Sequence, residues 1–223
     1  MIKKQRYSHV LKWFADNMQN VKTELNYKND FQLLTAVVLS AQCTDKRVNI
    51  ITKELFYHYP DAETMSNASS ETIYEYIKSC SYPNNKAKYL SETAKILCDK
   101  YNGKIPEDVN ELKKLPGVGR KTAHVIASVL YKQPKMPVDT HVYRVAKRIG
   151  LTVNAKTPLQ AEKQLVKYIP KNLIPDAHHW LILHGRYVCK AKSPDCNNCG
   201  INIFCKYYDG LKKLKHSNKI KYK

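Results

Sequence analysis

Residues 115–145 read LPGVGRKTAHVIASVLYKQPKMPVDTHVYRV and carry the most informative pattern in the chain. Two glycines, Gly117 and Gly119, bracket a valine directly before a run of helical character. Glycine lets the backbone turn tightly and lets a ligand approach bare N–H groups. The helix expected from about residue 120 to 131 points the positive end of its dipole at this turn. The pattern therefore predicts a turn that suits a phosphate.

Lys121 and Asp139 are the residues of this stretch with reactive side chains. Lys121 lies in the first turn of the expected helix, and Asp139 stands where the next helical run begins. A lysine beside a phosphate-binding turn, followed by a carboxylate, is a candidate amine nucleophile with an acid–base partner. Each feature alone is weak, because a G-x-G turn is common and a lysine near a helix start is usually solvated.

Composition favours a polyanionic partner. The 223 residues include 38 Lys and Arg against 19 Asp and Glu, a formal net charge of +19. Such a charge attracts nucleic acid, because neutralising phosphates releases counterions, although an AT-rich genome produces lysine-rich proteins as well. No apolar run approaches the roughly 20 residues of a membrane span, and the N-terminus lacks the apolar core of a secretory signal.

Four cysteines crowd near the C-terminus with the spacing C-x6-C-x2-C-x5-C: Cys189, Cys196, Cys199 and Cys205. In a chain without an export signal, this crowding indicates metal binding rather than disulfides. Four soft thiolates suit either zinc or an iron–sulfur cluster, and by spacing alone zinc is the more common occupant.

Apolar residues recur with helical spacing through most of the chain, which predicts an all-α protein. Residues 64–70 are expected to be polar and rich in helix-capping residues, and the basic tail from residue 206 is expected to be frayed. The helices are expected at 7–18, 31–41, 45–58, 71–80, 86–102, 106–114, 120–131, 140–149, 158–168 and 175–188.

The segments LPGVGRKTAHVI and VDTHVYRVAKRIGL resemble the helix-hairpin-helix DNA glycosylases, specifically the endonuclease III family of base-excision repair. The resemblance implies an all-α, two-lobed helix-hairpin-helix DNA glycosylase fold with a C-terminal iron–sulfur cluster loop. It implies a helical barrel domain with the hairpin motif at residues 23–133. Residues 1–22 and 134–223 are expected to form the cluster domain.

The resemblance also implies an activity. Members of the family are bifunctional DNA N-glycosylases that remove oxidised or ring-saturated pyrimidines from damaged double-stranded DNA. They then cut the strand as AP lyases, by β-elimination through a lysine imine. Lys121 occupies the position of the family's nucleophile and Asp139 that of its second catalytic residue. A monomer is expected, located in the cytoplasm and associated with the nucleoid if the source is a bacterium, or in the nucleus or an organelle if it is a eukaryote.

Two further segments match the part of the family that lies against DNA. The run SAQCTD resembles the LLSAQ-x-TD segment and makes Gln42, Thr44 and Asp45 candidate DNA contacts, with Gln42 filling the space of the displaced base. In the alternative, these residues join two helices and Asp45 caps the second. Tyr82 stands at the position of a bulky wedge that is usually aliphatic, and an aromatic ring can also unstack base steps.

Backbone-binding residues complete the expected DNA surface. By resemblance, Gly117, Gly119 and Arg120 grip the strand at the hairpin. Lys190 and Lys192 lie in the short basic loop between the first two clustered cysteines, where they are candidate phosphate contacts.

The resemblance reverses the prediction for the metal, because the endonuclease III family has this cysteine spacing and holds a [4Fe-4S] cluster. The ligands would be Cys189, Cys196, Cys199 and Cys205. The chain departs from the family at Lys113 and Lys114, where relatives often carry an acidic residue. Three other interpretations compete: an adenine-mismatch glycosylase, which lacks the lysine, a noncatalytic helix-hairpin-helix module, and an iron–sulfur electron carrier.

Overall fold

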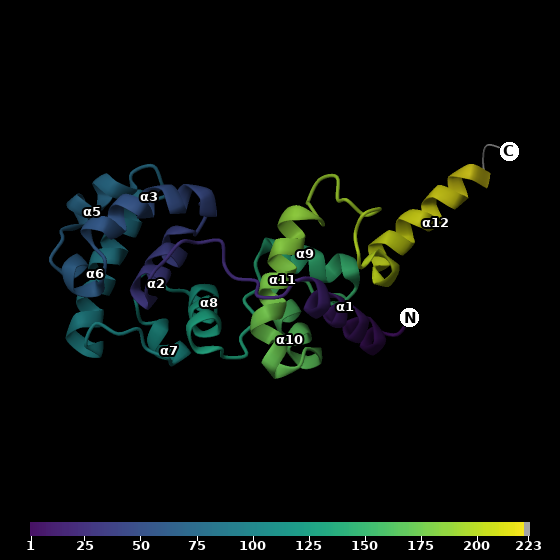
Figure 1. Ribbon diagram of the computed structural model, residues 1–223, viewed down its shortest axis with the longest axis horizontal. Coiled ribbons are helices and arrows are strands. Elements are labelled where there is room, and N and C mark those ends of the chain that lie inside the picture. Colours follow the sequence, from purple (N-terminus) through teal and green to yellow (C-terminus); the bar gives the residue numbers. More distant parts are fainter. Residues whose placement is uncertain (221–223) are drawn as a thin grey trace. The chain divides into compact units, whose positions relative to one another are not determined.

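A computed structural model of the chain describes the backbone of residues 1–220 and the side chains of residues 1–214 (Figure 1). Over this range the chain forms helices and no strands, which confirms the all-α prediction. None of the helices in the described range is long and apolar enough to cross a membrane. The α-helices are α1 Lys3–Asn17, α2 Asp30–Leu39, α3 Asp45–His58, α4 Ala62–Ser66, α5 Ser70–Ile77, α6 Pro83–Tyr101, α7 Val109–Leu112, α8 Arg120–Tyr131, α9 Thr140–Ile149, α10 Pro158–Tyr168, α11 Ile174–Tyr187 and α12 Lys206–Ile220; the short 3-10 helices are η1 Lys171–Leu173 and η2 Asn202–Phe204.

The chain divides into two compact units. One unit is Thr23–Gln133, and the other joins Met1–Lys22 to Pro134–Lys223. Each unit has a hydrophobic core of its own, as expected of segments that bury their apolar faces separately.

The Thr23–Gln133 unit is built around α2, whose residues from Phe31 to Leu39 are all buried. Asn29 starts this helix by accepting a hydrogen bond from the backbone N–H of Gln32 at 2.9 Å. Because α2 is predominantly apolar and its residues are buried on every side, it must be surrounded by other parts of the chain. It packs against α3, α6 and α8, and Figure 1 shows it (purple) alongside α8 (teal).

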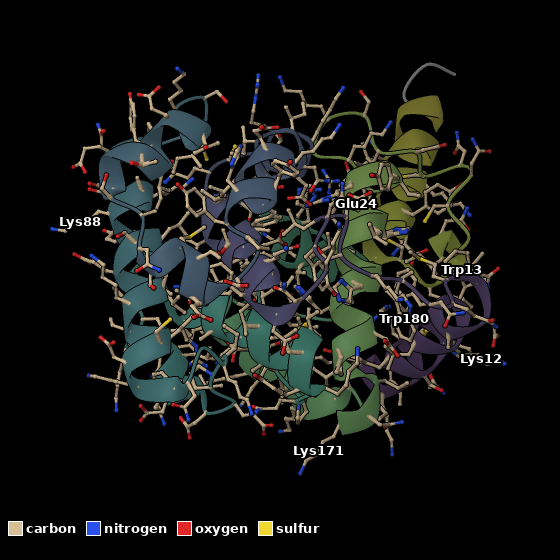
Figure 2. All side chains as sticks on the ribbon, turned by 60° about the vertical axis from the view of Figure 1, so that its left-hand side comes forward. Lys12, Trp13, Glu24, Lys88, Lys171 and Trp180 are labelled. Carbon is tan, nitrogen blue, oxygen red and sulfur yellow. The ribbon has the colours of Figure 1, made fainter. Side chains whose placement is uncertain are left out.

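The other unit packs α1 against helices from the C-terminal part of the chain. Phe14 of α1 stacks on Trp180 of α11 with ring centroids 5.9 Å apart. The indole of Trp180, which is labelled in Figure 2, donates a hydrogen bond to the carbonyl of Met18 at 2.8 Å, just after α1 ends. These contacts between distant parts of the sequence hold α1 in the same core as α9 and α11.

The structure corrects two of the predicted elements. The polar stretch expected at 64–70 overlaps α4, a helix that was not predicted and that begins with a capping box between Asp61 and Thr64. The prediction of a frayed tail is wrong for residues 206–220, which form α12, while residues 221–223 lie outside the described range. Near the start of α12, Tyr207 packs on the core and lies under the Arg148 guanidinium, 4.9 Å from ring centroid to carbon.

Candidate active site and cysteine pocket

The hairpin turn lies between α7 and α8 and is anchored by the buried side chains of Leu115 and Val118. Gly117 has φ +74°, and a Cβ there would lie 2.8 Å from Tyr89 Cδ2, so both its conformation and its contact require glycine. Gly119 occupies the N-cap position of α8, and no side chain accepts a hydrogen bond from the first N–H groups of the helix there. An N-terminus that no side chain caps is a suitable place for an anion.

Lys121 is the second residue of α8, and its side chain is exposed. Arg120 beside it is exposed as well. Asp139, in the other unit, is the N-cap of α9 and accepts a hydrogen bond from the backbone N–H of Val142 at 2.7 Å. Its carboxylate is therefore held by its own helix start, and the residue is half-buried.

Lys113 and Lys114 precede the hairpin, and part of their positive charge is balanced by a nearby carboxylate. The Lys114 ammonium lies 2.6 Å from a Glu111 carboxylate oxygen, and the Tyr101 hydroxyl donates to the same carboxylate at 2.8 Å. The hydrogen bond with Lys114 lowers the pKa of Glu111, and the same bond raises the pKa of Lys114. Of the two lysines that depart from the family pattern, one therefore has a carboxylate partner.

The residues after α2 form a tight link to α3. Gln42 is exposed and has φ +56°, a left-handed conformation that is uncommon for glutamine. Thr44 caps α3, because its side chain accepts a hydrogen bond from the backbone N–H of Arg47 at 3.3 Å. Asp45 is the first residue of the helix, so the alternative in which Asp45 is the cap is wrong.

Tyr82 lies in the same region of the Thr23–Gln133 unit. Its side chain is 61% exposed, and its backbone also has φ +56°. The neighbouring Ser81 hydroxyl donates a hydrogen bond to the carbonyl of Gln42 at 2.5 Å. The structure thus brings together two predicted DNA-contacting segments that lie far apart in the sequence.

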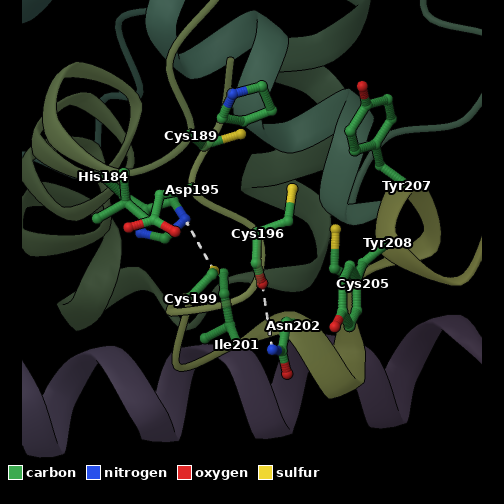
Figure 3. Close-up of a pocket in the computed structure, with 12 residues that line it drawn as sticks. His184, Cys189, Asp195, Cys196, Cys199, Ile201, Asn202, Cys205, Tyr207 and Tyr208 are labelled. Atoms are coloured by element: carbon green, nitrogen blue, oxygen red, sulfur yellow. Dashed lines mark hydrogen bonds between the residues drawn. The ribbon is translucent and has the colours of Figure 1, made fainter. Parts of the chain in front are cut away.

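The four clustered cysteines line one pocket at the end of α11 (Figure 3). Cys199 Sγ lies 3.6 Å from His184 Nε2, and the Asn202 side chain donates to the carbonyl of Cys196 at 3.2 Å. Within the described residues, no three His, Cys, Asp or Glu side chains are grouped closely enough to hold one metal ion. The pocket is lined by His184, Val188, Cys189, Pro194, Asp195, Cys196, Cys199, Ile201, Asn202, Cys205, Tyr207 and Tyr208.

Burial controls the protonation of this pocket. It raises the pKa of the Cys199 thiol to about 11 and also raises the pKa values of Cys196 and Cys205. Burial lowers the pKa of His184 to about 4. The raised pKa values keep the Cys196, Cys199 and Cys205 thiols protonated at neutral pH, and binding of a metal would release their protons.

The basic loop next to the pocket is held by an arginine. Lys190 and Lys192 are both exposed. The Arg148 guanidinium donates to the carbonyls of Lys190 at 2.6 Å and Ala191 at 3.0 Å. These bonds hold the backbone of the loop and do not involve the side chains of Lys190 and Lys192, which are exposed to solvent.

Two buried or half-buried cations were not singled out by the sequence. Arg148 holds the basic loop, and Lys86 is 5% exposed and donates to backbone carbonyls. Both residues stand in helices among other basic residues. A basic side chain that binds backbone carbonyls and one that is exposed to solvent give the same sequence pattern. Only their three-dimensional contacts separate them from their neighbours.

Comparisons with known proteins agree in their result. Residues 35–171 match the HhH-GPD superfamily of base excision DNA repair proteins. The chain is 49% identical to the endonuclease III of Rickettsia felis over 92% of its own length and 96% of that protein. It is 42% identical to the Escherichia coli endonuclease III, again over 92% and 96% of the two chains.

Solved structures of DNA glycosylases resemble this chain over most of its length. A trapped endonuclease III–DNA covalent intermediate matches with a TM-score of 0.87 and 42% identity, over 95% of this chain and all of that one (100%). A thermostable thymine-DNA glycosylase, 21% identical, shares the fold with a TM-score of 0.79 over 93% of this chain and 97% of that one. The predicted helix-hairpin-helix glycosylase fold is confirmed by these matches.

Proposed function

Since the chain belongs to the endonuclease III family of base excision DNA repair glycosylases, we propose that it removes oxidised or ring-saturated pyrimidines from double-stranded DNA and cleaves the strand through an imine on Lys121. The observation that carries the proposal is the placement of Lys121 in the first turn of α8, directly after a glycine turn with no side-chain cap. The relatives are bacterial, which supports a role on bacterial chromosomal DNA.

The first step is the opening of the duplex. A base inside the stack cannot be attacked, so it must be flipped out at a cost of roughly a few kcal/mol. In this proposal Gln42 and Tyr82 occupy the space left behind. Both side chains are exposed and start from left-handed backbone positions. The hairpin holds the strand through Gly117, Gly119 and Arg120.

The second step is chemistry at the sugar. The uncharged amine of Lys121 attacks C1′, a new C–N bond forms, and the bond to the damaged base breaks. Asp139 accepts a proton or stabilises the positive charge that develops on the sugar. The nitrogen loses a proton, the C1′–O4′ bond of the sugar ring breaks, and O4′ takes up a proton. The open sugar is then joined to Lys121 by a protonated imine, which acidifies the C2′ proton. Removal of that proton expels the 3′ phosphate, and the strand is cut by β-elimination.

We further propose that Cys189, Cys196, Cys199 and Cys205 hold a [4Fe-4S] cluster. All four thiols line one pocket, and about 320 Å³ between its walls, part of it open to solvent, is free of protein atoms. A single zinc ion needs four ligand sulfurs about 2.3 Å from one centre. The choice of a [4Fe-4S] cluster over zinc is supported by the C-x6-C-x2-C-x5-C spacing, which the chain shares with the endonuclease III family. The cluster would fix the loop that carries Lys190 and Lys192.

Metal analysis of the purified protein tests the cluster. We expect iron and inorganic sulfide in equal amounts, with broad visible absorbance. Cys199→Ser should lose both, whereas Cys98→Ser, which changes a half-buried cysteine of α6 outside the pocket, should keep them. Zinc without inorganic sulfide would contradict the cluster and leave the DNA chemistry untouched.

The imine is tested with a duplex that carries one thymine glycol, incubated with the protein and sodium borohydride. We expect a covalent protein–DNA adduct in the wild type and none in Lys121→Gln, with DNA binding largely kept. Lys113→Gln is the matched control, because it removes an exposed lysine close to the same hairpin.

Two outcomes would change the assignment. Base release without an adduct would indicate a monofunctional glycosylase. A Lys121→Gln protein that nicks abasic DNA at the wild-type rate would refute Lys121 as the nucleophile. With neither release nor adduct from the wild type, only DNA binding would remain.

A further inference from the structure

Lys86 stands apart from the other lysines of α6 because its side chain is 5% exposed. Its ammonium lies 2.8 Å from the carbonyl oxygen of Leu39 and 2.7 Å from that of Ala41. The third contact, at 3.2 Å, is with Cys80 Sγ. An ammonium has three N–H donors and no acceptor. Every donor of Lys86 therefore has a partner inside the protein.

The carbonyls that Lys86 contacts are those of Leu39, the last residue of α2, and of Ala41, which follows the C-cap Ser40. The last carbonyls of a helix have no partner within the helix and carry the negative end of its dipole. Side chains on a helix point back toward its N-terminus, so Lys86, in the first turn of α6, reaches away from α6 toward this end. The buried charge is thus balanced by helix-terminal carbonyls.

The segment held in this way leads directly into Gln42. Gln42 follows Ala41, has φ +56°, and accepts the hydrogen bond from the Ser81 hydroxyl at 2.5 Å. On the other side, the backbone N–H of Lys86 donates to the carbonyl of Tyr82 at 3.2 Å, and Tyr82 also has φ +56°. This is the first backbone hydrogen bond of α6, which any residue other than proline would make at position 86; the Lys86 side chain therefore ties the start of α6, beside Tyr82, to the segment that leads into Gln42.

We propose that Lys86 is a positioning residue for duplex opening, which holds the Gln42 and Tyr82 backbones at a fixed separation so that both side chains enter the DNA together. This inference rests on the proposed roles of Gln42 and Tyr82. Left-handed backbone at residues other than glycine persists where the surroundings enforce it, and such positions gather at functional sites. Lys86 and Ser81 supply that enforcement here.

A positioning role of Lys86 predicts different effects on two kinds of substrate, a damaged duplex and a single strand with an abasic site. Release of a damaged base from a duplex needs the gap to be filled, and so depends on the hydrogen bonds of Lys86 and Ser81 that hold Gln42 and Tyr82, which together form a clamp. An abasic site in single-stranded DNA has no pair to open, and imine formation there depends on Lys121. Loss of the clamp should therefore slow the first reaction and leave the second nearly unchanged.

The test replaces Lys86 by methionine, which keeps the length of the side chain and removes its donors. The matched control is Lys88→Met, two residues along α6, where the lysine is exposed, pairs with Glu92 at 3.9 Å and points outward in Figure 2. Since a misplacement of about 1 Å can cost about a hundredfold in rate, we expect thymine glycol release from duplex DNA to slow by at least about tenfold.

Two further readouts distinguish positioning from a general defect. In Lys86→Met, borohydride trapping on a single-stranded abasic oligonucleotide should stay near the wild-type rate. A 2-aminopurine placed opposite the lesion should show less unstacking. Equal losses in duplex release and single-strand trapping would overturn the inference, as would no loss in either. Absence of trapping by the wild type would instead refute the proposed function.

A second variant covers the case in which Lys86→Met does not fold, since that change leaves the carbonyls of Leu39 and Ala41 without their buried partner. Ser81→Ala removes the other tie to Gln42 at a half-buried position. It should reduce duplex release in the same direction and leave single-strand trapping intact. Wild-type release by a folded Ser81→Ala protein would contradict the clamp.

Discussion

Asp139 combines two roles at the scale of a single residue. It is the N-cap of α9, with its carboxylate 2.7 Å from the N–H of Val142, and it is also the proposed acid–base partner of the reaction. A carboxylate fixed by a helix start keeps one orientation without help from other side chains. The two roles can be separated because the cap needs an oxygen acceptor and the reaction needs a charge.

Asp139→Asn should keep the stability of the protein and lose most of the glycosylase rate. Asparagine caps helices as well as aspartate does, whereas alanine in place of a cap costs about 1 kcal/mol. Asp139→Ala should therefore lose both activity and about that much stability. Urea unfolding and single-turnover base release measure the two effects. An Asn variant as unstable as the Ala variant would contradict the separation.

Gly117 gives a second prediction for a single residue. With φ +74° and a Cβ that would lie 2.8 Å from Tyr89 Cδ2, Gly117→Ala should destabilise the protein by roughly 1–2 kcal/mol. Gly119→Ala is the matched control, since a Cβ there meets nothing within 4 Å. Urea unfolding of the two variants compares them directly. If Gly119→Ala were the more destabilising change, the steric argument at Gly117 would fail.

At the scale of elements, the end of α8 is tied to the segment before α7. The Tyr131 hydroxyl donates to the carbonyl of Ile105 at 2.6 Å, and the Gln133 side chain donates to the carbonyl of Glu107 at 2.9 Å. These bonds hold the C-terminal end of α8, the helix that carries Lys121 in its first turn. Ionisation of the tyrosine would remove the donor, so the hydrogen bond of Tyr131 depends on pH.

Burial raises the pKa of Tyr131 from 10.0 to about 12. The unfolded chain ionises first, so stability from this group is complete below about pH 10 and is lost as pH rises through the folded pKa. Tyr131→Phe should be less stable than wild type at neutral pH, and the difference should narrow above about pH 10. Urea midpoints across this range measure it. Tyr57→Phe, at a position 79% exposed, should track the wild type.

At the scale of the whole molecule, the charge of +19 acts on any DNA regardless of sequence. Binding that releases counterions weakens linearly on a logarithmic salt scale, with a slope of about −0.9 for each neutralised phosphate. The formal charge does not say which lysines contribute, because those paired with carboxylates are already balanced.

Replacement of Lys190 and Lys192 by alanine should lower the magnitude of the salt slope by about 1 for each lysine that contacts a phosphate. Lys12→Ala is the matched control, since Lys12 is paired with Asp16 at 3.0 Å and should leave the slope nearly unchanged. Fluorescence anisotropy with undamaged duplex at several salt concentrations gives the slopes. If the salt slope of the double variant were unchanged, Lys190 and Lys192 would not contact DNA phosphates.

The sequence by itself determined the all-α class, the positions of most helices, the hairpin at Gly117 and Gly119, and the family. These depend on local pattern: apolar periodicity, capping residues and glycine turns are written in neighbouring positions. The candidate residues Lys121 and Asp139 stand in such patterns. Helix α12 was missed because its support comes from distant partners, such as Arg148 against Tyr207.

Only the tertiary structure decided what the buried cations do and which loops meet. Lys86 is one of several lysines in α6, and its burial follows from the end of α2, which is 47 residues earlier at Leu39. The hydrogen bond from Ser81 to Gln42 likewise spans 39 residues. A side chain that satisfies carbonyls far away in the chain leaves no mark in the pattern around it. The fold brings those carbonyls to the ammonium of Lys86. Because the ammonium is buried away from water, these carbonyls are the acceptors that satisfy its N–H groups.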